Sequence, residues 1–216
     1  MLRKEISRYV EDPLIRSMRV RAWFQAVTKT SGLTTHELER EFCAGEGNPR
    51  SCIWNKYRRG EVVPRSAENG DGGPKLVERV EGRYPGTAIW LLSPLWRLVD
   101  NEPMEMSDIR RIYDEMPSSI RSIFVLPDDK FAKIFWRKLT EPEYVCEILL
   151  RFRDVNALVA LLTMLREAEI TQNREQYRFA LGALAQIIKS GTSLETSECA
   201  AISELVRYLR LRLPTF

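Results

Sequence analysis

The chain has 216 residues, of which 44% are hydrophobic and 29% are charged. This length allows one large domain or two small ones, and the composition is that of a globular protein rather than a disordered or fibrous one. The net charge of +3 excludes a strongly basic chain. Residues 1–100 contain 17 Lys/Arg and 13 Asp/Glu, whereas the remainder contains 16 and 17. The positive excess therefore favours an anionic partner for the N-terminal part.

The first residues and the cysteines indicate a compartment. The segment MLRKEISRYVEDP has charges where a signal peptide needs an apolar core, and no apolar run is long enough to cross a bilayer. The cysteines are widely spaced, with no C-x-x-C pair: Cys43, Cys52, Cys146 and Cys199. We therefore expect a cytoplasmic protein with free thiols and no membrane association.

Helical signals follow one another through the N-terminal part. Residues 13–30 carry an apolar stripe made of Leu14, Met18, Ala22, Ala26 and Val27. The stretch TTHELEREF begins with a threonine cap and places Leu38 and Phe42 four residues apart. We expect a short helix over 51–59 that stops at Gly60, another over 75–82, and a short one from Pro85.

Two breaks organise the chain. RSAENGDGGPK, at 65–75, is rich in turn-forming residues and predicts a surface loop. The polar segment at 100–106, which includes Pro103, lacks helical periodicity and predicts a linker. The expected domains are therefore 1–100 and 101–216.

The C-terminal part also reads as helices. SDIRRIYDEM has Ser107 as an expected cap, DDKFAKIFWRKL (128–139) has charges that match the helix dipole, and TEPEYVCEILLRF carries proline in its first turn. Two long helices follow over 154–170 and 173–191, and T-x-x-E at 192–195 predicts a capping box for the last helix. Only SIFVL (122–126) is strand-like. The fold class is therefore all-α, with an irregular C-terminal helical bundle.

Three segments taken together carry a family resemblance. SGLTTHELEREF, SCIWNKYRRGEVVP and KLVERV give a helix, a turn, a short helix ending at glycine, a proline and a further helix. Over residues 14–84 this resembles the Xre/Cro family of phage-repressor-like helix-turn-helix domains. The matching positions are Gly32, Leu33, Thr34, Glu37 and Leu38 in the scaffold helix, and Tyr57, Arg58, Arg59, Gly60 and Pro64 in the recognition helix. The departures are Glu39 where alanine is common, Arg58 where an acid is often found, a longer turn CAGEGNPR, and the inserted GDGG loop.

The resemblance implies a DNA-contacting helix. With Ile53, Trp54 and Tyr57 facing inward, the outward residues suit base edges and phosphates, because Asn pairs with adenine and Arg with guanine. Residues near the helix end, and a threonine at the start of the preceding helix, suit phosphates. The expected DNA-binding residues are Thr35, Arg50, Ser51, Asn55, Lys56, Arg58 and Arg59. The same pattern also fits a charged surface helix that is anchored by Trp54 and Tyr57 and exposed only to water.

Signals for other chemistry are weak. The single histidine, His36, excludes a multi-histidine metal site within one chain, and its spacing to Cys43 and Cys52 matches no standard zinc site. There is no G-x-x-x-x-G-K-[ST] loop. We therefore predict no catalytic residue, no metal and no cofactor.

The leading hypothesis is a DNA-binding protein, a transcriptional regulator of a bacterial or phage system, with double-stranded DNA as its partner. The apolar C-terminal helices fit either an internal core or an interface with a second copy or a protein partner. The alternative hypothesis is a protein-interaction adaptor, such as an accessory subunit of a mobile-element or phage-defence system, whose helix-turn-helix scaffold does not touch DNA.

Overall fold

The computed structural model describes residues 9–43, 52–66, 74–100, 102–126, 136–152, 154–190 and 200–212. The described part is all-α, as predicted. Within it no β-strand forms, and Val125 pairs with Arg137 in an isolated antiparallel bridge. Most of the strand-like SIFVL segment instead belongs to helix α8 (Ser118–Phe124).

The chain forms two compact units that interleave along the sequence. Unit 1 comprises Met1–Asp12 and Arg97–Ser190, and unit 2 comprises Pro13–Trp96 and Gly191–Phe216. This division differs from the expected 1–100 and 101–216, because it falls within helix α6 (Leu95–Val99) and assigns the last helix to unit 2. The amphipathic pattern of that helix shows that one face is buried, but it does not say which neighbour covers it.

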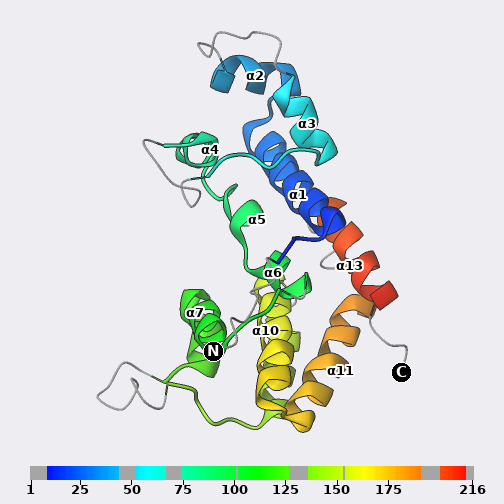
Figure 1. Cartoon of the computed structure of the whole chain (residues 1–216). Coiled ribbons are helices and arrows are strands. Elements are labelled where there is room, and N and C mark those ends of the chain that lie inside the picture. Colours follow the sequence, from blue (N-terminus) through cyan, green and yellow to red (C-terminus); the bar gives the residue numbers. More distant parts are fainter. Residues whose placement is uncertain are drawn as a thin grey trace, which may run out of the picture. The chain divides into compact units, whose positions relative to one another are not determined.

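Unit 2 is built around its first helix, α1 (Pro13–Ser31). This helix packs against α3, α5 and α13, and Figure 1 shows α13 running beside it. The other helices are α2 (Thr35–Cys43), α3 (Ile53–Arg59), α4 (Leu76–Arg83), α5 (Ile89–Leu92) and α13 (Ala200–Arg212). The buried surface of α1 is wider than the predicted apolar stripe. Leu14 is 46% exposed, whereas Ile15, Trp23 and Phe24 are buried, because several neighbours surround the helix.

An aromatic cluster forms the core of unit 2 around Trp54, which is completely buried. Trp23 stacks on it with ring centroids 5.5 Å apart, Tyr57 meets it edge-on at 5.7 Å, and Phe42 lies at 5.8 Å. These four residues are called the Trp54 cluster. They come from α1, α2 and α3, so one set of ring contacts joins the three helices.

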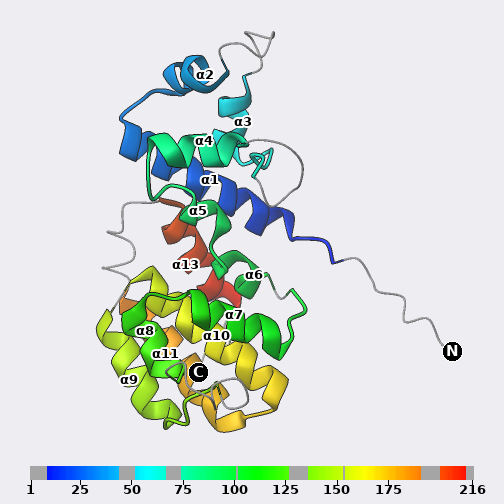
Figure 2. The same ribbon diagram turned by 90° about the vertical axis from the view of Figure 1, so that its left-hand side faces the viewer.

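Unit 1 is a helical bundle centred on α10 (Val155–Thr171), which packs against α7, α8, α9 and α11 (Figure 2). The neighbouring helices are α7 (Met106–Glu115), α8, α9 (Pro142–Phe152) and α11 (Arg174–Ser190). Every residue of α10 from 157 to 165 is buried, which is more than the single buried face of an amphipathic surface helix. Packing on several sides explains this difference.

Some helix boundaries differ from those expected. Helix α7 begins at Met106 with Glu105 as its cap, in a capping box with Asp108, so the predicted Ser107 cap is wrong. Pro142 is the first residue of α9, as its position in the first turn indicated. Residues 136–140 are not helical, and the rest of the predicted 128–139 helix lies outside the described residues. Most of the 65–75 loop and the whole 192–195 capping box also lie outside them.

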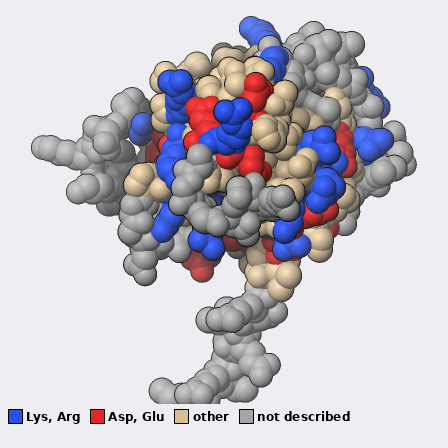
Figure 3. Space-filling view, turned by 90° about the horizontal axis from the view of Figure 1, so that it is seen from above, with Lys and Arg blue, Asp and Glu red and all other residues tan. Residues whose placement is uncertain are grey.

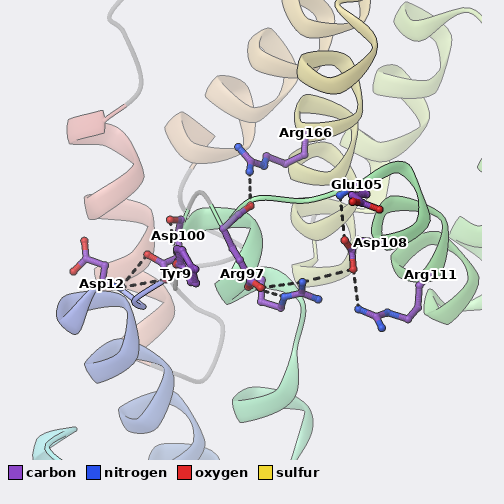
Figure 4. A network of polar contacts seen from close by, with 9 residues as sticks. Tyr9, Asp12, Arg97, Asp100, Glu105, Asp108, Arg111 and Arg166 are labelled. Carbon is purple, nitrogen blue, oxygen red and sulfur yellow. Dashed lines mark hydrogen bonds and ion pairs between the residues drawn. The ribbon is translucent and has the colours of Figure 1, made fainter. Parts of the chain in front are cut away.

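The predicted linker at 100–106 is part of a polar network in unit 1 (Figure 4). Arg97 binds the Glu102 carboxylate through Nε at 2.7 Å and NH2 at 3.1 Å, and Arg166 NH2 donates to the Glu102 carbonyl at 2.6 Å. The Asp12 backbone N–H donates to the Asp100 carboxylate at 3.1 Å. Contacts with Arg97, Arg166 and Asp12 therefore hold this non-helical segment in place.

A buried carboxylate, Glu167, joins the elements of unit 1. Arg137 binds it through Nε at 2.8 Å and NH2 at 3.1 Å, while the Tyr113 hydroxyl and the Gln176 amide each donate to it at 2.9 Å. The Arg137 guanidinium also lies 5.2 Å from the Tyr113 ring centroid and 4.9 Å from that of Phe124. Burial, and then the Glu167 charge, raise the pKa of the Tyr113 hydroxyl. Each oxygen of the buried Glu167 carboxylate is therefore hydrogen-bonded.

We predict that Arg137→Met lowers the free energy of unfolding by about 3 kcal/mol, because it leaves the buried Glu167 charge without its cation. Arg137→Lys keeps the charge but loses the bidentate geometry and the ring stacking, so its loss is smaller. Urea unfolding followed by circular dichroism measures both values. Equal stability of Arg137→Met and the unmodified chain would show that the ion pair does not stabilise unit 1.

Candidate nucleic-acid interface

Helix α3 has only seven residues, too few to be stable on its own, so its packing holds it in place. Trp54 and Tyr57 are buried and Ile53 is half-buried, as the inward setting predicted. The predicted stop at Gly60 is also confirmed. Its φ of 71° is left-handed, and the backbone N–H groups of Gly60 and Glu61 return to the carbonyls of Tyr57 and Lys56, each at 3.0 Å.

Gly60 has a second role that the sequence did not reveal. A Cβ atom at this position would lie 2.3 Å from Ser17 Oγ and 2.6 Å from the Ser17 carbonyl oxygen. The end of α3 therefore approaches the backbone of α1 more closely than any side chain permits. The sequence signal at Gly60 explained only the helix stop, because the contact with α1 spans more than forty residues of sequence.

The start of α2 is capped by a reciprocal pair. The Thr34 backbone N–H donates to Glu37 Oε2 at 2.8 Å, and the Glu37 N–H donates to Thr34 Oγ1 at 3.3 Å. The Thr34 hydroxyl also donates to Glu37 Oε2 at 2.7 Å, and the hydrogen bonds from the Thr34 backbone and hydroxyl lower the pKa of Glu37. The predicted threonine cap is therefore Thr34. Thr35, the expected phosphate contact, is the first residue of α2 and is half-buried.

Four of the other expected DNA contacts lie on α3. Lys56, Arg58 and Arg59 are exposed and Asn55 is half-buried, whereas Arg50 and Ser51 lie outside the described residues. Arg59 is engaged by Glu61, with Nε and NH2 at 2.5 Å and 3.0 Å from its two carboxylate oxygens. The hydrogen bond from Arg59 lowers the pKa of Glu61. Arg59 thus presents a charge that is already partly neutralised.

Glu39, the departure from the family's alanine, connects the two helices of the motif. Its Oε2 accepts a hydrogen bond from the Trp54 backbone N–H at 3.2 Å. A carboxylate near a helix N-terminus is stabilised by the orphan N–H groups and the helix dipole there. Glu39 therefore fixes α3 against α2 and also places a negative charge at the start of the expected recognition helix.

The surface charge at this end of unit 2 is mixed in sign, and in Figure 3 Lys and Arg lie beside Asp and Glu. Several acids here are held by local partners: Glu37 by Thr34, Glu61 by Arg59, and Glu41 by Tyr84 and Arg83. The side chains of four cations make no hydrogen bond or close ion pair with another described residue: Arg40, Lys56, Arg58 and Arg65. The charges of Arg40 and Lys56 still act on the carboxylates of Glu37 and Glu61. Charges of both signs are therefore presented to an external partner at this end of unit 2.

Other kinds of site find little support in the described residues. Among them, no three His, Cys, Asp or Glu side chains lie close enough to hold a metal ion. His36 and Cys52 are exposed and Cys43 is half-buried. Every helix in the described ranges is too short or too polar to span a bilayer. Comparison of the chain with protein-family models, curated proteins and solved structures found no match.

We predict that Gly60→Ala destabilises unit 2 well beyond Gly32→Ala. Both glycines have left-handed φ, 71° and 69°, but a Cβ at Gly32 meets nothing within 4 Å. Gly32→Ala therefore carries only the backbone cost of about 1 kcal/mol, whereas Gly60→Ala adds a clash with α1 for a total of about 3 kcal/mol or more. Urea denaturation of both variants measures the difference. Equal losses would mean that α3 does not approach α1 this closely.

Proposed function

We propose that the chain binds double-stranded DNA through α2 and α3 and acts as a transcriptional regulator in the cytoplasm of a bacterial or phage-infected cell. One observation carries the proposal. Helix α3 is anchored by buried Trp54 and Tyr57 while Lys56 and Arg58 extend outward without an ion-pair partner among the described residues. An inward aromatic anchor with outward cations is the arrangement that a helix needs to enter a groove.

The expected contacts divide into two kinds. Lys56 and Arg58 suit phosphates, which give affinity and position without reading sequence. Asn55, half-buried beside them, has the amide that pairs with adenine. Arg59 would contact a phosphate only by giving up its ion pair with Glu61. Thr35, Arg50 and Ser51 complete the proposed set.

The proposed protein partner, or second copy of the chain, would bind the C-terminal helices. Unit 1 carries three exposed aromatic side chains on its helices, Tyr144, Phe152 and Tyr177. Exposed aromatic residues are enriched at protein interfaces, which supports this part of the proposal.

A specific observation favours a second candidate function, the adaptor without DNA contact. The Glu39 carboxylate lies at the start of α3, where a groove-reading helix meets the negative charge of DNA, and Glu61 engages Arg59. Both acids oppose a polyanion. In this case the same face would bind a protein surface of mixed charge.

We predict that the double variant Lys56→Ala/Arg58→Ala weakens binding to a short random-sequence duplex at low salt and reduces the slope of log K against log salt by about two, because each phosphate contact contributes about 0.9. Fluorescence anisotropy over a salt series measures both quantities. The matched control Arg151→Ala/Lys189→Ala removes the same charge from exposed positions in unit 1 and should leave affinity nearly unchanged.

Two results would contradict DNA binding through α3. One is a wild-type chain that retains no duplex at low salt, which favours the adaptor. The other is an equal loss for both double variants, which would reflect net charge rather than a site.

We further predict that Glu39→Gln strengthens duplex binding by several-fold. The glutamine amide oxygen still accepts the Trp54 N–H, while the charge that repels phosphates is removed. The same anisotropy assay measures affinity, and circular dichroism checks that the helical signal is kept. An unchanged or weaker affinity in a folded variant would show that DNA does not approach the start of α3.

A further inference from the structure

A cavity of about 430 Å³ opens beside α3 within unit 2. This volume falls in the range of roughly 300–1,000 Å³ that is typical of small-molecule sites. Its apolar lining includes Phe42 from α2, Ile53 and Tyr57 from α3, and Leu76 from α4. Phe42 and Tyr57 are almost fully buried in the Trp54 cluster, so half-buried Ile53, Val63 and Leu76 present most of this apolar wall.

Hydrogen bonds between separate segments hold the walls of this cavity in place. An Arg79 guanidinium N–H donates to the carbonyl oxygen of Phe42, which joins α4 to the end of α2. The Val77 backbone N–H donates to the Arg65 carbonyl at 3.1 Å and fixes the segment after α3 against α4. These contacts hold α2, α4 and the segment after α3 against one another.

The charged residues of the described lining have one sign. Arg65, Lys75 and Arg79 contribute to it, and the described lining residues include no Asp or Glu. Arg65 is exposed, and its side chain makes no hydrogen bond or ion pair with another described residue. Cations beside an apolar wall attract an anion more strongly than the same cations on open surface, since the local dielectric is lower.

We propose that this cavity binds a small amphipathic anion. The apolar body would lie against Ile53, Val63 and Leu76, and a carboxylate, sulfonate or phosphate group would point toward Arg65. A cation is disfavoured by the charge of the described lining, and a fully polar ligand would leave the apolar wall without a partner. The inference does not rest on DNA binding, because none of its contacts involves the outward residues Lys56 and Arg58.

Two probes with the same body test the proposal on the full chain. Anilinonaphthalene sulfonate carries the anion, and N-phenylnaphthylamine is its uncharged counterpart; both fluoresce when they enter an apolar site. We expect saturable binding of the sulfonate at one molecule per chain, and tighter than the amine. Arg65→Gln should weaken binding of the sulfonate by about fivefold, the value for one partly exposed charge pair. It should leave the affinity for the amine unchanged.

Two further variants make the test specific. Val63→Trp fills the cavity and should abolish binding of both probes, with the helical signal checked by circular dichroism. Arg16→Gln removes an exposed cation of α1 that is not part of the lining, so it should change neither affinity. If Val63→Trp does not fold, the comparison of Arg65→Gln with Arg16→Gln decides. Absence of saturable binding, equal affinity for the two probes, or an Arg65→Gln variant that behaves like Arg16→Gln would overturn the proposal.

Discussion

Burial of Trp54 is the constraint on which unit 2 depends. Its ring contacts Trp23 of α1 and Phe42 of α2, and it fixes a helix of seven residues that has little stability of its own. The indole N–H groups of Trp23 and Trp54 have no hydrogen-bond partner among the described residues, so packing and ring contacts hold the cluster. The buried side of α3 therefore sets the direction in which the side chains on its outer side point.

Contacts at the two ends of α3 set the details of that arrangement. The close approach of Gly60 to Ser17 fixes where α3 ends, and the Glu39 hydrogen bond to Trp54 fixes where it begins. Between these two points, Lys56 and Arg58 have a defined direction while Arg59 is turned toward Glu61. Unit 1 is held together differently, because the buried Glu167 carboxylate accepts hydrogen bonds from side chains of several elements.

Features governed by near neighbours in sequence were predictable. The Thr34 cap, the stop at Gly60, and the inward setting of Trp54 and Tyr57 each follow from signals within a few residues. Features that join distant segments were not. Glu39 stood out only as a departure from the family pattern, because its partner Trp54 lies fifteen residues away. The apolar face of α13 did not show that α1 covers it. The polar segment near residue 100 looked like a linker because its partners, Asp12 and Arg166, are remote in sequence.

The return of α13 to α1 has a consequence for biosynthesis. Leu205, Val206 and Leu209 are buried in unit 2, and Arg21 of α1 pairs with Glu204 at 2.7 Å. On a ribosome that adds roughly 5–20 residues per second, α1 emerges about ten to forty seconds before its last neighbour is made. The Arg97–Ser190 part of unit 1 is translated within that interval. The apolar side of α1 that α13 later covers is therefore exposed on the nascent chain, where a chaperone can bind it.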